Sequence, residues 1–464
     1  MKANAQSINE TAIASRLARW TASFALSDAP DEALNIARRC IIDTIGVAIA
    51  GSRLSVSNDM RAHITAQYGS GSCNLLGTGQ GASALGAVLA NGVAAHALDF
   101  DDTSYAGVVH GSAIVLPAVL AAAEMANITG ARFLEAFIAG SEAVYALGLT
   151  LTESHYMSGW WATGTLGAIG ACAGAAKALV LSEEKTAAGL ALASLQANGL
   201  LAMLGTDAKP VTAGRAARLG LESALLAAQG NSAPKHVFED RRGFLALMNE
   251  GYAEAAGLVE LGQTWRLMTP GIAVKRHPVC SAAQAAAELT ERLIDENQLD
   301  RAQIKEVRCD VPHLVKISLV YDNPVNPAQA QFSMTFALGC ILAFGALGPS
   351  QICAETLDDE KLRSAMSKVK MVEAEDLNGV EYQPRYPECA RVFVSMQGGG
   401  EFSGFLGAPA GMPENPMSDE ALSGKFRECC IFAGWSEGSC EALLSCLWDV
   451  ENAPDMSALL KGRV

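Results

Sequence analysis

The sequence has few charged residues, and basic residues are the scarcer kind. Only 18% of its 464 residues are charged, and 34 Lys and Arg against 49 Asp and Glu give a formal net charge of −15. No dense run of Lys or Arg occurs, so the chain has no basic stripe to neutralise nucleic-acid phosphates. We therefore expect no nucleic-acid partner. A small anionic substrate stays possible, because a few cations in a cleft set the local potential.

Closely spaced cysteines, a leader segment and long apolar runs are also lacking. The twelve Cys include no Cys-x-x-Cys pair, which argues against a zinc site or an iron–sulfur cluster. Residues 1–10 are polar, so we expect no signal peptide, a cytoplasmic location and reduced thiols. The apolar stretches 162–181 and 334–347 are rich in Ala and Gly or too short to span a bilayer, so no membrane contact is predicted.

Apolar residues make up half of the chain, which excludes disorder as its main state. Up to about residue 265 they recur at helical spacing, as at Ile13, Leu17, Trp20 and Phe24. Ala-rich runs continue this pattern at 115–126, 142–151, 163–179, 187–204 and 213–229. Within the third run, Gly164, Gly167, Gly170 and Gly174 share one helix face. Glycines at this spacing predict that a neighbouring helix approaches closely.

The pattern changes after about residue 265. Residues 305–312 alternate apolar and polar side chains as a strand does, and 391–405 predict a hairpin around three glycines. Between them, 328–347 and 358–369 are predicted helices, and helical spacing returns after residue 420. The sequence therefore predicts a mainly α protein, in which an all-helical domain of residues 1–265 and 410–464 is interrupted by an α+β lid domain of residues 266–409. A functional cleft is expected between the two domains.

The densest polar cluster contains His96, Asp99, Asp101, Asp102 and Thr103, followed by His110-Gly-Ser112. Three carboxylates within four residues repel one another and need cations, donors or raised pKa values. Helix capping by Asp101, Asp102 or Ser112 is the alternative interpretation. Capping accounts for one acid before a helix, but not for three acids beside two histidines.

Two further segments place cations beside prolines at predicted turns. The first is residues 205–210, with Lys209 before Pro210, and the second is residues 275–280, with Lys275 and Arg276 before Pro278. Lysine and arginine in apolar surroundings suit carboxylate binding or proton transfer.

Five segments share their order and spacing with one known family: Asp43-Thr44-Ile45-Gly46 with Gly51, residues 95–103, His110-Gly-Ser112 with Pro117 and Glu124, Gly205 to Pro210, and Lys275 to Cys280. Through them the chain resembles the MmgE/PrpD family over nearly its whole length. The resemblance implies a helical domain built from both chain ends, an α+β lid, and a homodimer. It also implies cofactor-free chemistry on small polycarboxylates, namely methylcitrate dehydration, cis-aconitate decarboxylation or iminodisuccinate epimerisation.

The resemblance also implies a set of site residues, and it implies that they bind no metal or cofactor. The catalytic residues would be Lys209, Lys275, His110 and Asp99, and the substrate-binding residues Thr103, Arg276, Tyr321 and Trp161. The chain departs from the family pattern at three positions, where Trp161, Thr212 and Gln284 stand in place of histidines. Fewer imidazoles mean fewer acids to protonate a leaving hydroxyl.

These departures favour an epimerase acting on iminodisuccinate. Burial and neighbouring cations would lower the pKa of Lys209 or Lys275, so that one lysine serves as the base. His110, oriented by Asp99, would serve the opposite face of the α-carbon. The alternative is a 2-methylcitrate-type dehydratase or a cis-aconitate-type decarboxylase of the same family.

Two interpretations of the sequence lie outside the family. A magnesium-dependent terpenoid synthase would use Asp99-x-Asp101-Asp102 as its first acidic motif, but a second motif is missing because Lys361 directly follows Asp358-Asp359-Glu360. Aromatic residues, at 6%, are also few for lining a carbocation cavity. A helical scaffold without catalysis is the other alternative.

Overall fold

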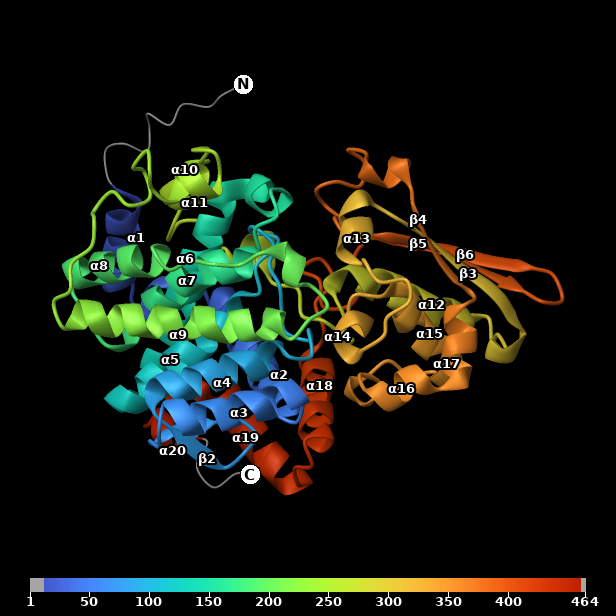
Figure 1. Cartoon of the computed structure of the whole chain (residues 1–464), viewed down its shortest axis with the longest axis horizontal. Helices are drawn as coiled ribbons and strands as arrows, with labels where there is room; N and C mark the ends of the chain where they lie inside the picture. The colour runs from blue at the N-terminus through green and yellow to red at the C-terminus, as the bar shows by residue number, and fades with distance from the viewer. Residues whose placement is uncertain (1–11, 460–464) are drawn as a thin grey trace.

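The computed structural model describes residues 12–459, so the N-terminal segment on which the signal-peptide prediction rests lies outside the described residues. Two hydrophobic cores organise the chain. The first draws on residues 13–274 and 422–456, and the second mainly on residues 279–429, with four residues from the N-terminal part of the chain. Figure 1 shows the corresponding helical body and smaller sheet-containing body side by side. The mainly α prediction is confirmed.

Helices from the part of the chain before residue 260 and the returning C-terminal helices build the helical domain. They are α1 (Ile13–Ser23), α2 (Asp31–Gly51), α3 (Ser55–Gln67), α4 (Ala84–His96), α5 (Gly111–Ala126), α6 (Gly130–Met157), α7 (Ala162–Ala178), α8 (Glu183–Ser194), α9 (Ala208–Ala228), α10 (Phe244–Met248), α11 (Ala256–Val259), α18 (Asp419–Phe432), α19 (Glu437–Trp448) and α20 (Met456–Leu459). Hydroxyl side chains cap several of their N-termini, as Ser182 does for α8. Phe426 of α18 packs on Gly46 of α2, which joins the chain ends.

Two glycines of the predicted stripe, Gly170 and Gly174, lie where α6 and α7 cross, whereas Gly167 faces Ile114 of α5 and Gly164 faces the turn at Asn198. A Cβ on Gly170 would come within 2.6 Å of Val144, and one on Gly174 within 3.0 Å of the Ala136 carbonyl oxygen. The prediction of close helix packing is confirmed. By length and composition α6 is apolar enough to cross a membrane, but its most apolar window is 94% buried inside the structure. This burial is typical of the central helix of a core.

The smaller domain contains a four-stranded sheet in the order β4-β3-β5-β6. Strand β3 pairs in parallel with β4 and antiparallel with β5, and β5 and β6 form a hairpin. Burial alternates along β5, so one face of the sheet meets α12 and the other is partly exposed. The elements are α12 (Gln284–Glu296), β3 (Ile304–Val311), α13 (His313–Ser318), α14 (Pro327–Ala330), α15 (Met334–Phe344), α16 (Ala354–Asp358), α17 (Glu360–Met366), β4 (Val369–Glu373), β5 (Ala390–Met396) and β6 (Glu401–Leu406).

Several predicted elements end earlier than expected. The helix expected over 187–204 stops at Ser194, because Asn198 and Gly199 lead into an extended turn where Trp160 pairs with Leu200. The helix expected over 358–369 gives way to β4, whose edge position leaves little alternation for a sequence pattern to show. The helical domain also contains one short hairpin, β1 (Cys73–Leu75) with β2 (Gln80–Ala82), so it is not all-helical.

The two domains meet beside the loop that follows α4. Leu98 and Phe100 from this loop, with Val47 and Ala50 from α2, belong to the core of the smaller domain. The polar cluster found in the sequence therefore lies at the domain boundary.

Candidate functional site

Three segments bring the predicted site residues together. The acidic loop, residues 97–110, joins α4 to α5, and the lysine segment, residues 272–283, leads into α12. The third segment is the first turn of α9, which carries Lys209 next to Pro210; proline is tolerated there because first-turn amides lack intrahelical partners. Thr103 and Ala273 exchange two backbone hydrogen bonds, which fix the acidic loop against the lysine segment.

Asp99 lies between the two predicted catalytic lysines. Lys209 Nζ is 2.5 Å from Asp99 Oδ1, and Lys275 Nζ is 3.1 Å from Oδ2 and 2.6 Å from the Asp99 carbonyl oxygen. All three residues are buried. Asp99 has a φ of 48°, in the left-handed region that costs energy for a residue other than glycine. Asp99 has this conformation in the structure in which both lysines bind it.

The electrostatics of this contact correct the prediction of a neutral lysine base for Lys275, one of the two lysines considered. Burial opposes ionisation of Asp99, but Lys209 and Lys275 outweigh it and hold the pKa of Asp99 below its ordinary value. For Lys275, burial would lower the pKa, and the carboxylates of Asp99 and Asp101 together raise it instead. Lys275 is therefore an ammonium, which can bind an anion, and not a neutral base.

Asp101 links two histidines. Its Oδ2 is 2.8 Å from His96 Nδ1 and 3.2 Å from His110 Nδ1. Burial lowers the pKa of His96 to about 4, so its ring is neutral near pH 7. A neutral ring that donates from Nδ1 to Asp101 accepts at Nε2, and Lys209 Nζ lies 2.5 Å from that atom. His96 thus bridges Asp101 and Lys209 through its two ring nitrogens.

The prediction that Asp99 orients His110 is wrong: the partners of the His110 ring are Asp101 and Asp102. Its Nδ1 donates to the carbonyl oxygen of Asp102, 2.9 Å away, and faces Asp101. Because Nδ1 carries the proton, Nε2 is the ring atom left to exchange a proton with a bound molecule.

Asp102 does not cap a helix. The N-cap of α5 is His110, without a side-chain cap, and Ser112 Oγ instead donates to Asp102 Oδ2 at 2.5 Å. The capping interpretation is therefore wrong for these acids. Burial raises the pKa of Asp102 to about 7, and the Ser112 bond offsets only part of this effect.

The predicted substrate-binding residues do not all lie beside the charged cluster. Trp161 belongs to the cluster: its ring centroid is 5.4 Å from Lys209 Nζ and 5.3 Å from the His96 ring. Thr103 is buried and contributes its backbone bonds to Ala273. Tyr321 donates to the Leu204 carbonyl oxygen at 2.9 Å and packs on Gly205, whose φ of 74° and lack of Cβ make room for the ring. It supports the turn before Lys209.

Arg276 is not brought into the cluster. Its guanidinium is 2.9 Å from Glu291, and its side chain is 45% exposed. Together with His277 and Lys425, Arg276 lines a separate hollow of about 510 Å³. Neighbouring positions of an extended segment point to opposite sides, so Lys275 and Arg276 cannot both face the cluster.

Gln284, one of the departures from the family pattern, stabilises the lysine segment. Its Oε1 accepts from the amides of Arg276 and His277 at 3.1 and 3.0 Å, and its Nε2 donates to the carbonyls of His277 and Val279. All four bonds are to backbone, so no polar atom of Gln284 is directed at the cluster.

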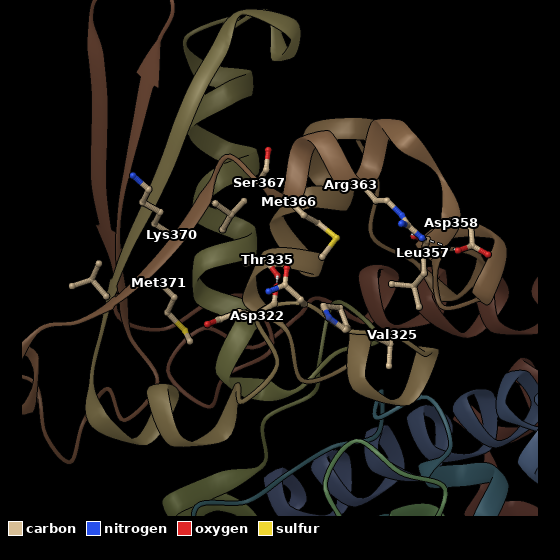
Figure 2. A pocket seen from close by; sticks show the side chains of 14 residues that line it. Asp322, Val325, Thr335, Leu357, Asp358, Arg363, Met366, Ser367, Lys370 and Met371 are labelled. Carbon is tan, nitrogen blue, oxygen red and sulfur yellow. Dashed lines mark hydrogen bonds and ion pairs between the residues drawn. The ribbon is translucent and has the colours of Figure 1, made fainter.

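A hollow of about 650 Å³ reaches the charged cluster from the domain boundary. His96 and Lys209 line it together with Arg53, Thr206 and Phe332. This volume suits a small-molecule site. Another hollow, of about 830 Å³, lies within the smaller domain; Figure 2 shows Arg363 directed at Asp358 there, and none of the predicted site residues line it.

The residue set also meets the spacing of a metal site. One ligand atom from each of His96, Asp99, Asp101 and His110 lies within 4.8 Å of the others. However, the ammonium of Lys209 is 2.5 Å from both His96 Nε2 and Asp99 Oδ1. A lysine already takes the place where a cation would bind, so these residues do not fit a metal unless Lys209 moves.

The site includes residues that the sequence prediction left out. His96 and Asp101 were noted in the polar cluster but not assigned a role, although their spacing within it was a usable signal. Glu388 was missed entirely. It binds Tyr105 of the acidic loop and Ser281 of the lysine segment, and its sequence neighbourhood carries no motif.

The chain belongs to the MmgE/PrpD family: residues 15–255 match the family's N-terminal domain and residues 277–441 its C-terminal domain. It is similar to the cis-aconitate decarboxylase-like protein oryM of Aspergillus oryzae, at 26% identity covering 97% of this chain and 96% of that protein. The cis-aconitate decarboxylases of Aspergillus terreus and Homo sapiens are 27% and 28% identical, covering 92% and 93% of this chain and 91% of each relative. None of these three names supports the predicted epimerase, and they favour the alternative of a cis-aconitate-type decarboxylase.

Proposed function

We propose that the chain is a lyase that decarboxylates a small polycarboxylate of the cis-aconitate type. The observation that carries the proposal is the pair of buried lysines on either side of Asp99, next to two histidines and a hollow large enough for the substrate. The names of the relatives support the same reaction class.

The lysines supply what a polycarboxylate needs. A substrate carboxylate bound by Lys209 or Lys275 replaces part of their contact with Asp99, so the ammonium groups keep an anionic partner before and after binding. Charge-assisted contacts of this kind are stronger in a buried site than in water. Trp161 and Phe332, whose rings flank Lys209, keep the ammonium from solvent and restrict its direction.

Decarboxylation also requires a proton donor to carbon. The bond to the departing carboxylate breaks, CO2 leaves, and the electron pair ends on carbon, where it takes up one proton. We infer that the Lys275 ammonium, or His110 when its ring carries a second proton, delivers that proton, since both belong to the cluster around Asp99 and Asp101. Cofactor-free turnover, assembly as a homodimer and a cytoplasmic location accompany this proposal as predictions.

Epimerisation is the second candidate, because one observation favours it. Trp161 stands where the family pattern has a histidine, and its ring contacts Lys209 and His96 inside the cluster. An epimerase needs no acid for a leaving group, so the loss of this imidazole is less damaging to it than to a dehydratase.

One set of incubations separates the reactions. Purified enzyme is mixed with cis-aconitate, 2-methylcitrate or iminodisuccinate in D2O, and released CO2, ultraviolet absorbance and proton NMR are followed together. Decarboxylation releases CO2 from cis-aconitate, whereas dehydration of 2-methylcitrate raises the absorbance of a conjugated alkene without CO2. Loss of the α-proton signal of iminodisuccinate with neither change would favour the epimerase and overturn the proposal.

A further inference from the structure

Glu388 connects the two loops that carry the charged cluster. It lies two residues before β5 in the smaller domain and is 7% exposed. Tyr105 Oη donates to Glu388 Oε2 at 2.5 Å, and Ser281 Oγ donates to Oε1 at 2.9 Å. Tyr105 belongs to the acidic loop and Ser281 to the lysine segment. Each carboxylate oxygen therefore binds a different loop.

The contacts bracket Lys275. On one side, Thr103 and Ala273 join the two loops through their backbones. On the other side, Tyr105 and Ser281 join them through Glu388. Lys275 lies between residues 273 and 281, so a rotation of the lysine segment that would withdraw its ammonium from Asp99 has to break one of the two connections.

The pKa directions of Glu388 and Tyr105 are consistent with a hydrogen bond that the Tyr105 phenol donates to the Glu388 carboxyl group. Burial raises the pKa of Glu388, and the hydroxyls of Tyr105 and Ser281 with the charge of Lys275 offset that effect. Burial and the nearby Glu388 carboxylate raise the pKa of Tyr105, so its phenol stays a donor. A buried carboxylate with donors on both oxygens is costly to disturb, because removing a partner leaves a desolvated acceptor.

We propose that Glu388 is a positioning residue, which holds the acidic loop and the lysine segment in register through Tyr105 and Ser281. Among the described residues, no hydrogen bond or ion pair links Glu388 to Asp99 or to either lysine of the cluster, so it acts through the loops and not on bound substrate. The consequence for catalysis rests on the proposed lyase function, whereas the coupling of the loops does not.

Hydrogen exchange tests the coupling without any assay of activity. Exchange into the full-length chain is followed by mass spectrometry for the wild type, Glu388→Ala, Tyr105→Phe and Ser281→Ala. We expect Glu388→Ala to speed exchange in both residues 103–109 and residues 276–283, and each single hydroxyl variant to affect mainly its own loop. Faster exchange confined to the neighbourhood of residue 388 would overturn the proposal.

A double-mutant cycle tests the consequence for catalysis. Small displacements of catalytic groups cost up to about 10²-fold in rate. We expect Tyr105→Phe to lower kcat by about 10-fold in the wild type but to have almost no further effect in the Glu388→Ala background. Fully additive effects would show that Tyr105 and Glu388 act independently, which contradicts the tie.

A matched pair controls for loss of any Ser–Glu contact in the smaller domain. Ser395 Oγ donates to Glu401 Oε2 at 3.2 Å on the exposed hairpin of β5 and β6. Ser395→Ala and Glu401→Gln should leave both kcat and exchange in the two loops unchanged. If wild-type enzyme turns over no polycarboxylate, the lyase proposal fails, yet the exchange experiment still decides whether Glu388 couples the loops.

Discussion

Two buried lysine–aspartate contacts at the domain boundary differ in how many ammonium groups face the carboxylate. Asp43 of α2 faces one, Lys425 of α18, at 2.7 Å. Asp99 faces two, Lys209 and Lys275, at 2.5 and 3.1 Å. Asp43 and Asp99 are nearly inaccessible to solvent, so burial penalises both charges alike.

The two carboxyls respond in opposite directions. Burial raises the pKa of Asp43 in spite of Lys425, and nearby Asp101 adds to the rise. With two lysines, the pKa of Asp99 is lowered in spite of the same burial. Lys425 is further held by the Phe100 carbonyl and ring. The single lysine at Asp43 thus joins α18 to α2. At Asp99, the second lysine is a further cation that can bind an anionic ligand.

The largest effects are expected from the two-lysine contact. Lys209→Ala and Lys275→Ala should each lower kcat by about 10²–10⁴-fold if the lysine transfers a proton, the range typical of general acid–base catalysis. If a lysine only binds a carboxylate, the loss should appear mainly as a higher KM. Because Asp99 keeps its other lysine in each variant, the free energy of unfolding should fall only modestly.

Arg276→Ala is the control, because Arg276 precedes the same proline turn but faces Glu291. It should change kcat and KM by less than about threefold, because its ion pair with Glu291 is partly exposed and lies outside the charged cluster. Wild-type turnover and affinity in both lysine variants would place neither lysine in the site.

The one-lysine contact should show the reverse pattern. Lys425→Met leaves Asp43 buried without its cation and should lower the free energy of unfolding by about 3–5 kcal/mol. Asp43→Leu combined with Lys425→Met should recover much of this loss, because an apolar pair can replace a buried ion pair. Urea denaturation measures both variants. Lack of recovery in the double variant would mean that the pair does more than join α2 to α18.

A smaller effect is expected from Asp102, whose pKa is raised to about 7 by burial. A carboxyl that holds its proton more tightly when folded stabilises the protein most below its unfolded pKa, near 4, and this advantage is lost as the pH rises toward 7. The unfolding free energy of the wild type relative to Asp102→Asn should therefore fall between pH 4 and pH 7. A difference that is constant with pH would show that Asp102 does not titrate in this range.

The sequence predicted the fold class better than the residues at which helices and strands begin and end. Helical periodicity and the glycine stripe located α5, α6, α7 and α9, because apolar spacing is a local property of a helix. Strand β4 was missed because pairing with β3 is a long-range contact, and its exposed positions follow no alternation.

For the site, motifs located the groups but not their partners. Asp99, Lys209 and Lys275 lie together, as expected from the site residues that the family resemblance implies. The sequence could not show that Arg276 turns outward, that His110 follows Asp102 instead of Asp99, or that the pKa of Lys275 rises. Those properties depend on side-chain direction and on the summed field of residues distant in the chain.

The smallest effect, none at all in the wild type, is expected from metal ions. EDTA should leave turnover unchanged, because Lys209 Nζ lies 2.5 Å from His96 Nε2 and Asp99 Oδ1, which belong to two of the four residues that would bind a metal. Lys209→Met removes this ammonium from His96 Nε2 and Asp99 Oδ1, so that a cation can take its place beside them. Zn²⁺ should then raise the Tm of Lys209→Met but not that of the wild type, since a ligand stabilises only the state it binds. Turnover that disappears in EDTA and returns with one metal would instead show that Lys209 gives way to an ion, and the two-lysine contact would no longer describe the working site.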